Sequence, residues 1–341
     1  MTHRERVLKT FRFEKTDRSP YDLMEGVIWP EFFDYLKSTF GVESTDRVCD
    51  FLDTDIRWIP AIYSGPQYQL PTHALDNPPD APLRNAHTVA EVEAYVHEDP
   101  FLWTPPDFAA ARQRWPEHEL MCFPGWFALF WTACGVFGMQ EALIKTETEP
   151  DVFEAMIRKR HTFSMDVVSR MLDAAQGYSD ICFLGDDYAG NDSLVMRPDT
   201  WRRLIKPYLK EEVELIHSHG MYAILHSCGA IREIIPDLIE IGVDALLVFQ
   251  TSARGMDAES IARDFGGKIV FYGGVDCLHL LTFGTPDDVR REVKSNIDHF
   301  SACGGYIVAN SHHGIGNMKP ENMLAMYEAA RGYPFSVGML Q

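Results

Sequence analysis

The chain is poor in positive charge. It contains 31 Lys and Arg residues against 50 Asp and Glu residues, which leaves a formal net charge of −19. An excess of negative charge opposes binding to phosphate backbones and to anionic membrane surfaces. The acidic residues are scattered and form no tail, so we expect an acidic soluble surface and no nucleic-acid partner.

Long hydrophobic runs are missing as well. No segment approaches the ~20 apolar residues that span a bilayer, and residues 1–22 lack the continuous apolar core of a secretory signal. We therefore expect a cytoplasmic protein without a membrane partner.

Cysteine is present in an odd number and without a regular spacing. The seven cysteines are Cys49, Cys122, Cys134, Cys182, Cys228, Cys277 and Cys303. Most lie inside apolar stretches, which favours reduced thiols over a disulfide framework. Nucleotide-binding motifs are absent too, because Gly273-Gly274 and Gly304-Gly305 form neither a GxGxxG pattern nor a Walker loop.

Short apolar runs alternate with helix-like segments from about residue 118 onward. The expected strands are 121–123, 180–184, 222–225, 245–249, 269–272 and 306–309. The expected helices are 138–146, 150–175, 200–219, 231–241, 258–265, 286–302 and 320–331. Unalternating apolar strands separated by helices are typical of a parallel sheet that is buried on both faces. We expect an α/β fold of the (β/α)8 barrel type, with a doubly wound open sheet as the alternative.

The N-terminal third is less regular. Residues 1–20 predict a helix followed by a break, and a first strand near 21–25 would carry Glu25 at its end. Residues 26–117 are rich in Pro, Trp, Tyr and Asp, and we interpret them as helices and long loops over the barrel mouth. Residues 1–341 are then expected to form one domain.

Polar residues follow the expected strands, at the ends where α/β barrels place their chemistry. The most informative turn is His226-Ser227-Cys228-Gly229. Side chains alternate along a strand, so His226 and Cys228 project to the same side and can both face one metal ion. The alternative is that Cys228 is a small buried apolar residue.

Further donors stand at other strand ends. His312 and His313 follow the last expected strand, which neighbours the first strand and Glu25 when a barrel closes. Zn²⁺ accepts Cys sulfur, His nitrogen and carboxylate oxygen. The pattern predicts a zinc site of Cys228 and one or two of these histidines, with Glu25 as a further candidate ligand.

Four more positions are candidates for the site. Asp186 and Asp187 could orient a substrate or act as acid and base, or they could be a helix N-cap and a solvated carboxylate. Trp126 belongs to an aromatic cluster that either walls a pocket or fills the core. Gln250 and Asp276 follow two other strands and would shape the rim.

Several segments together resemble the uroporphyrinogen decarboxylase superfamily, over nearly the whole length. They are Arg4-Glu5-Arg6-Val7-Leu8, Asp17-Arg18-Ser19-Pro20, Gly185-Asp186-Asp187, Lys206-Pro207, His217-Ser218-His219-Gly220, Leu225-His226-Ser227-Cys228-Gly229, Pro236-Asp237-Leu238-Ile239, Gly273-Gly274-Val275-Asp276, Gly304-Gly305-Tyr306 and Pro320-Glu321-Asn322. The resemblance implies a (β/α)8 barrel.

The branches of the superfamily differ in chemistry. One branch decarboxylates uroporphyrinogen without metal and uses an arginine-rich N-terminal loop, where this chain reads Glu25-Gly26-Val27-Ile28-Trp29-Pro30. Another comprises zinc-dependent methyltransferases that work with methylcobamide-bearing corrinoid proteins, and its His-x-Cys pair matches His226 and Cys228. The remaining Cys ligand of that branch falls where this chain has His312.

The resemblance therefore implies methyl transfer between a methylated or methoxylated compound, or a thiol, and a corrinoid protein. A carboxy-lyase acting on a carboxylated tetrapyrrole, with Asp186 or Asp187 orienting the substrate, is the second expectation. A non-catalytic module that binds a tetrapyrrole or corrinoid is the third. A homodimer is compatible with all three.

Overall fold

The computed structural model describes residues 1–66, 81–96, 98–312 and 317–332. The chain divides into two compact units. The first unit comprises Met1–Trp58, Arg112–Met121 and Asp244–Gln341, and the second comprises Ile59–Ala111 and Cys122–Val243. Strands β1 (Ile56–Pro60) and β4 (Glu119–Phe123) each run across a unit boundary along the chain.

The second unit is built on parallel strands. Strand β5 (Ile181–Gly185) pairs in parallel with β6 (Tyr222–His226), and the register sets Gly185 opposite His226. The carboxyl ends of both strands therefore lie at the same edge. A short antiparallel pair, β2 (Ile62–Tyr63) and β3 (Trp103–Thr104), lies apart from them.

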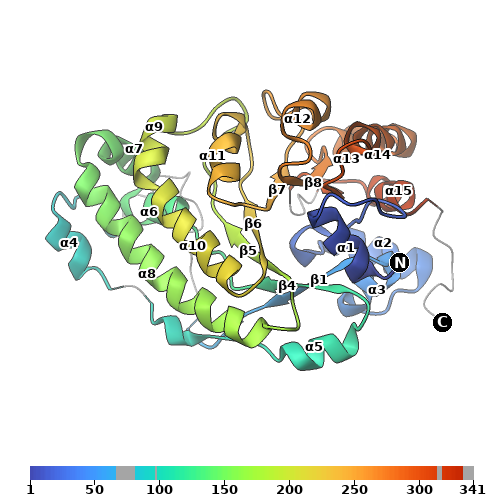
Figure 1. Cartoon of the computed structure of the whole chain (residues 1–341), viewed down its shortest axis with the longest axis horizontal. Coiled ribbons are helices and arrows are strands. Elements are labelled where there is room, and N and C mark those ends of the chain that lie inside the picture. Colours follow the sequence, from blue (N-terminus) through green and yellow to red (C-terminus); the bar gives the residue numbers. More distant parts are fainter. Residues whose placement is uncertain (67–80, 97, 313–316, 333–341) are drawn as a thin grey trace. The chain divides into compact units, whose positions relative to one another are not determined.

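Helices of the second unit pack on one another beside these strands. They are α4 (Val89–Ala94), α6 (Phe130–Phe137), α7 (Met139–Thr148), α8 (Pro150–Ala175), α9 (Pro198–Leu204), α10 (Lys206–Ser218) and α11 (Ile235–Glu240), while α5 (Phe108–Arg114) crosses a unit boundary. The long helix α8 contacts α4, α7 and α10, and α8 and α10 run side by side in Figure 1. Helix α10 turns Leu209, Val213 and Ile216 inward, at the i, i+4, i+7 spacing of an amphipathic helix.

The first unit has its own parallel strands. Strand β8 (Val270–Val275) pairs with β7 (Ala245–Phe249) and with β9 (Tyr306–Asn310), both in parallel. The helices of this unit are α1 (His3–Phe11), α2 (Pro30–Phe40), α3 (Val48–Leu52), α12 (Ala258–Phe265), α13 (Leu280–Phe283), α14 (Pro286–Phe300) and α15 (Pro320–Arg331). Helix α14 packs against both α12 and α15, and α14 and α15 are neighbours in Figure 1.

The segment before Glu25 lies beside the last strand, as barrel closure requires. Tyr21 forms a parallel bridge with Val308, and the Asp22 N–H donates to the Val308 carbonyl at 3.0 Å. The prediction of a strand over 21–25 is wrong, because the chain leaves the strand direction after this bridge. Met24–Gly26 forms a turn of 3-10 helix, because the Gly26 N–H bonds back to Leu23 and leaves the strand direction, and Glu25 takes a left-handed backbone with φ of 54°.

Two other expectations need correction. The helix expected over 200–219 is split into α9 and α10 near Pro207, a residue that has no N–H to donate to the preceding turn. The region 26–117 was expected to hold helices and loops, but it also contains strand β1. The strand was not predicted because a charged residue, Arg57, is buried in the middle of it. By contrast, α8, α12 and α15 begin and end at the expected residues.

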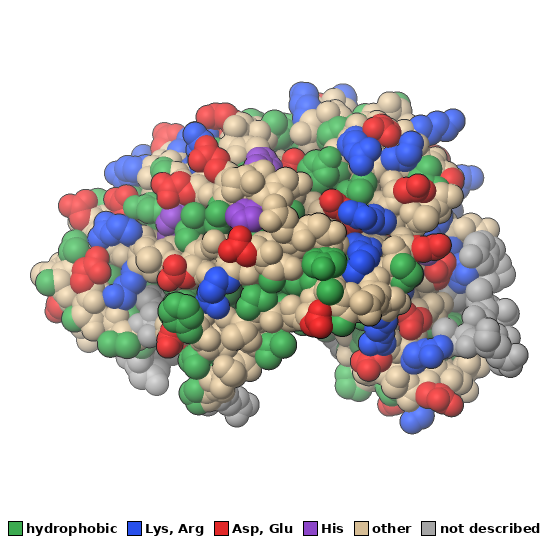
Figure 2. Space-filling view, turned by 60° about the horizontal axis from the view of Figure 1, so that its bottom comes forward, with side chains coloured by type: hydrophobic (Ala, Val, Ile, Leu, Met, Phe, Trp, Pro, Cys, Tyr) green, Lys and Arg blue, Asp and Glu red, His purple; other side chains and the backbone are tan. Residues whose placement is uncertain are grey.

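Parallel strands that alternate with helices make this an α/β fold of the (β/α)8 type, as expected from the sequence. None of the helices in the described ranges is both long and apolar enough to cross a bilayer. Acidic and basic side chains are interspersed on the face shown in Figure 2.

Candidate metal and active site

The turn after β6 carries the expected pair. His226 is the last residue of β6 and is 1% exposed, while Cys228 is partly exposed and is not in a disulfide. Gly229 has a φ of 86°, and a Cβ there would come within 2.5 Å of the Gly190 carbonyl oxygen. Only glycine fits this position, so the turn that presents Cys228 depends on it.

Asp187 joins the turn after β5 to the turn after β6. Its Oδ1 accepts the Cys228 N–H at 3.0 Å and lies 3.8 Å from His226 Nε2. The parallel register of β5 and β6 brings the two turns together, since Gly185 stands opposite His226. The structure thus brings together three of the expected site residues, Asp187, His226 and Cys228.

Asp186 points elsewhere. Its two carboxylate oxygens accept the N–H groups of Phe130 at 2.7 Å and Trp131 at 2.9 Å, at the start of α6. The Asp187 N–H adds a third hydrogen bond at 3.0 Å. Burial raises the pKa of Asp186 to about 7, against the effect of these donors. Asp186 therefore caps α6, a helix that precedes it in the chain.

Trp126 lies against His226. The two ring centroids are 4.7 Å apart in an edge-to-face arrangement, and Phe183 is 6.0 Å from Trp126. Gly185 makes room for this indole, because a Cβ at Gly185 would lie 2.7 Å from Trp126 Cε3. The wall beside His226 in the second unit is therefore aromatic.

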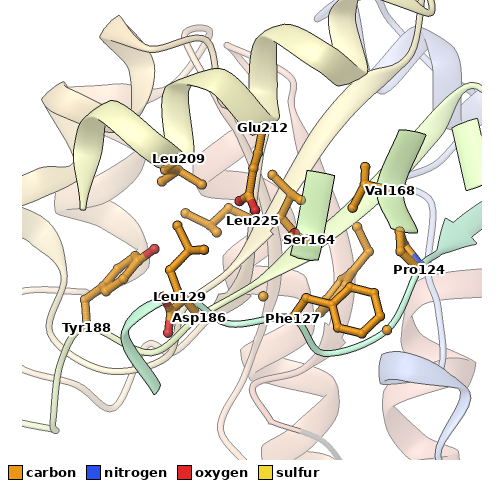
Figure 3. Close-up of a pocket in the computed structure, with 14 residues that line it drawn as sticks. Pro124, Phe127, Leu129, Ser164, Val168, Asp186, Tyr188, Leu209, Glu212 and Leu225 are labelled. Carbon is orange, nitrogen blue, oxygen red and sulfur yellow. The ribbon is translucent and has the colours of Figure 1, made fainter. Parts of the chain in front are cut away.

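A small cavity lies between β5 and β6 on one side and α8 and α10 on the other (Figure 3). It holds about 10 Å³ for water, roughly one molecule. Ser164 Oγ, Tyr188 Oη and one oxygen of Glu212 are buried there without a hydrogen-bond partner among the described residues. Burial raises the pKa of Glu212 to about 8. Glu212 was missed, although it falls between Leu209 and Val213 on the apolar face of α10.

The other expected residues belong to the first unit. Gln250 is buried directly after β7, and Asp276 follows β8. The Asp276 carboxylate accepts the N–H groups of Leu278 and His279, so it orders its own turn. His312 follows β9, and His313 lies outside the described residues.

Asp22 is a buried acid of the first unit that sequence analysis gave no role. Its Oδ2 accepts the Trp58 Nε1–H at 2.7 Å and the Tyr272 hydroxyl, while Oδ1 is buried without a hydrogen-bond partner among the described residues. Burial raises the pKa of Asp22 to about 7, against the effect of the two donors. The sequence signal that could have indicated a buried acid was its position between Tyr21 and Leu23, three residues before the candidate ligand Glu25.

Metal donors gather most tightly in a different place. Within the described residues, three donor atoms that all lie within 4.8 Å of one another occur at His3, Asp53 and His118, in the first unit. His226, Cys228 and Asp187 are neighbours without forming so tight a group. The expectation that Glu25 is a further zinc ligand stays a prediction.

Comparison with known proteins gives matches of three kinds. The family described as "Uroporphyrinogen decarboxylase (URO-D)" matches residues 120–333. The protein called methylcobamide:CoM methyltransferase MtaA, from Methanosarcina barkeri, is 24% identical over 184 residues, which are 54% of this chain and 50% of that protein. Its counterpart from the Fusaro strain (DSM 804) is 23% identical over 184 residues. The chain thus spans about half the length of these curated relatives.

A solved structure extends the similarity of fold to almost the full chain. The structure titled "methyltransferase from Methanosarcina mazei" aligns with a TM-score of 0.64 at 15% identity and covers 97% of this chain and 99% of its own. At this identity the alignment supports the barrel-type fold alone. With the family match over residues 120–333, the chain belongs to the uroporphyrinogen decarboxylase (URO-D) family.

Proposed function

We propose that this protein is a zinc-dependent methyltransferase. It would move a methyl group between a small methylated or methoxylated compound, or a thiol, and a corrinoid protein. The observation that carries the proposal is the His226 and Cys228 pair at the carboxyl end of β6, tied to Asp187 from the neighbouring strand end. The relatives named methylcobamide:CoM methyltransferase support the corrinoid partner and suggest coenzyme M as a thiol to test.

The donor set fits zinc. Imidazole and thiolate are ligands that Zn²⁺ prefers, and a thiolate with one or more imidazoles is a common composition of zinc sites. His226 and Cys228 would hold the ion, with His312 and Glu25 proposed to complete the ligand set. Bound zinc would lower the pKa of a substrate thiol, or polarise a substrate oxygen, at neutral pH.

The surrounding residues would position this pair. Asp187 fixes the Cys228 backbone through the hydrogen bond at 3.0 Å. Trp126 restricts the His226 ring from one side and keeps water from it. Asp186 fixes the start of α6, and with it the segment that leads from Trp126. We propose that Gln250, Asp276 and His313 line the rim of the pocket.

The arrangement of the rest of the chain is part of the proposal. Residues 1–341 would act as one barrel domain in the cytoplasm, with α1 as the N-terminal helix and the helices and loops of 26–117 outside β1 over the barrel mouth. The corrinoid cofactor would be carried by the partner protein, so this chain would supply the zinc site and the pocket for the small molecule.

Elemental analysis of zinc tests the proposal, on protein purified without a histidine tag or chelator. A Cys228→Ser variant should lose the zinc held at this site and should lose demethylation of methylcobalamin in the presence of coenzyme M. A Cys303→Ser variant is the matched control, because Cys303 is also a partly exposed free thiol but lies in the first unit. Full zinc and full activity in Cys228→Ser would remove the basis of the proposal, and the decarboxylase reading would then be tested with uroporphyrinogen.

A further inference from the structure

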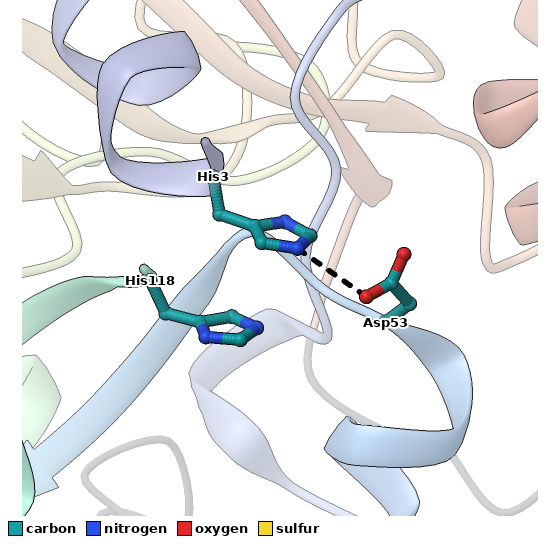
Figure 4. A group of neighbouring side chains, drawn as sticks. All are labelled: His3, Asp53 and His118. Carbon is teal, nitrogen blue, oxygen red and sulfur yellow. Dashed lines mark ion pairs between the residues drawn. The ribbon is translucent and has the colours of Figure 1, made fainter. Parts of the chain in front are cut away.

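A second group of side chains of the types that bind metal ions lies in the first unit, whereas the turn after β6 belongs to the second. His3 begins α1, Asp53 is the C-cap residue directly after α3, and His118 directly precedes β4 (Figure 4). One donor atom from each lies within 4.8 Å of the other two. We propose that His3, Asp53 and His118 bind a divalent transition-metal ion that ties these three segments together.

The spacing of two donors already suits a metal ion. His3 Nε2 and Asp53 Oδ1 are 3.3 Å apart. Two ligands of a tetrahedral zinc ion with bonds of about 2.0 Å are about 3.3 Å apart, so neither atom needs to move far. Two imidazoles and a carboxylate favour Zn²⁺ or Co²⁺, since Mg²⁺ and Ca²⁺ prefer oxygen ligands.

His3 is oriented as a metal ligand usually is. Its Nδ1 lies 2.8 Å from Oδ1 of Asp55, a buried carboxylate, which turns Nε2 toward Asp53. Metal-binding histidines commonly use their second nitrogen in this way, and the outer carboxylate fixes the tautomer and strengthens the ligand. Asp55 is itself held by Arg6 and Arg18.

His118 is the ligand that has to move. Its ring is stacked on that of His3 at 4.2 Å and 7°, and two imidazoles must tilt apart to point at one ion. His118 Nδ1 is buried without a hydrogen-bond partner among the described residues, and Nε2 contacts Arg57 Nη2 at 3.1 Å. Rotation of His118 therefore gives up one hydrogen bond.

Arg57 keeps other acceptors when His118 turns away. Its Nη2 group, which contacts His118, also lies 3.2 Å from the Cys49 carbonyl oxygen and 3.4 Å from Asp50 Oδ1. Its Nη1 group donates to the carbonyls of Thr54 and Ile56 and to the Thr54 hydroxyl at 2.6–3.1 Å. Asp53 is 42% exposed, which leaves a path for the ion from solvent.

The test measures Zn²⁺ binding to the full-length Cys228→Ser protein, which removes the other proposed zinc site. Competition with a chromophoric chelator should give one equivalent of Zn²⁺, and Co²⁺ should give visible d–d absorption. Asp53→Asn and His118→Gln should each weaken binding at least tenfold. Asn is chosen for residue 53 because it tolerates the left-handed backbone found there, with φ of 57°.

A His87→Gln variant in the same background is the control, because His87 is an exposed histidine that pairs with Glu149 in the second unit. It should bind Zn²⁺ as the parent does. Zn²⁺ should also raise the melting temperature of the parent and of His87→Gln, but not of His118→Gln. The proposal is overturned if the parent binds no Zn²⁺, or if Asp53→Asn and His118→Gln bind it as tightly as the parent.

Discussion

Asp187 Oδ1 accepts the backbone N–H of Cys228 at 3.0 Å. The same oxygen lies 3.8 Å from His226 Nε2. One carboxylate from the end of β5 therefore contacts both members of the pair that ends β6. A side chain in this place both holds the Cys228 backbone and sets the charge around the His226 ring.

On the proposed function, Asp187→Ala should weaken zinc binding and methyl transfer by about 10–100-fold, the usual effect of removing a group that positions metal ligands. Asp187→Asn keeps an oxygen that can accept the Cys228 N–H and should lose less. Zinc titration of both variants, followed by methylcobalamin demethylation, measures the difference. Equal losses in the two variants would show that the charge matters and the hydrogen bond does not.

Asp186→Ala should destabilise the protein without removing zinc. The substitution removes the acceptor of the buried Phe130 N–H and of the partly buried Trp131 N–H at the start of α6, a loss of about 2 kcal/mol. Urea unfolding measures this loss. Asp199→Ala is the control, since Asp199 is an exposed carboxylate near the start of α9, and it should change stability by less than about 0.5 kcal/mol. Loss of zinc in stable Asp186→Ala protein would argue for a direct role instead.

Gly185→Ala should push the Trp126 ring away from His226. The new methyl group would lie 2.7 Å from Trp126 Cε3 and 2.9 Å from Phe183 Cε1, closer than packed carbons allow. Overpacking of this kind costs about 1–3 kcal/mol. Tryptophan fluorescence and urea unfolding should both change. Gly190→Ala has nothing within 4 Å of the new methyl group, so its fluorescence should match wild type.

Glu212→Gln should make stability less dependent on pH. Burial raises the pKa of Glu212 from 4.5 to about 8, so between these values the native state holds a proton that the unfolded state has released. The free energy of unfolding of the wild type therefore falls as pH rises from about 5 to 8. Glutamine removes this titration. The free energy of unfolding of the variant minus that of wild type should therefore be larger at pH 8 than at pH 5.

The matched control for that experiment is Glu214→Gln, because Glu214 lies on the same helix with 60% of its side chain exposed. Its free energy of unfolding should stay within about 0.5 kcal/mol of wild type, as expected for a surface substitution. A Glu212→Gln curve parallel to that of wild type between pH 5 and 8 would contradict the raised pKa.

The sequence predicted the regular elements of the C-terminal two thirds well. Apolar runs such as 222–225 and 245–249 are short, β-rich and bounded by polar turns, so local pattern is enough to place β6 and β7. Helix α8 was placed to the residue, because Pro150 suits a first turn and the apolar spacing continues to Ala175. Strand β1 was missed because Arg57 and Trp58 interrupt its apolar pattern, and contacts with distant residues accommodate them: Arg57 contacts His118, and Trp58 donates to Asp22.

The candidate site was predicted as residue types at strand ends. The pair His226 and Cys228 was predicted from the alternation of side chains along one strand. Strand β6 ends at His226 and Cys228 lies in the following turn, so their orientation toward one metal ion stays a prediction. The separate roles of Asp186 and Asp187 could not be predicted, since adjacent carboxylates look alike in sequence. Asp186 turns to α6 and Asp187 to Cys228 because of where the folded chain places those N–H groups.

The sequence by itself determined the α/β class, the alternation of strands and helices, and the turn that carries His226 and Cys228, because these depend on short-range periodicity and turn chemistry. Only the tertiary structure decided which acids are buried and which donors meet. Glu212 at its cavity and the group of His3, Asp53 and His118 arise from contacts between segments that are far apart in the chain. Such contacts depend on packing and burial, and these are properties of the folded chain as a whole.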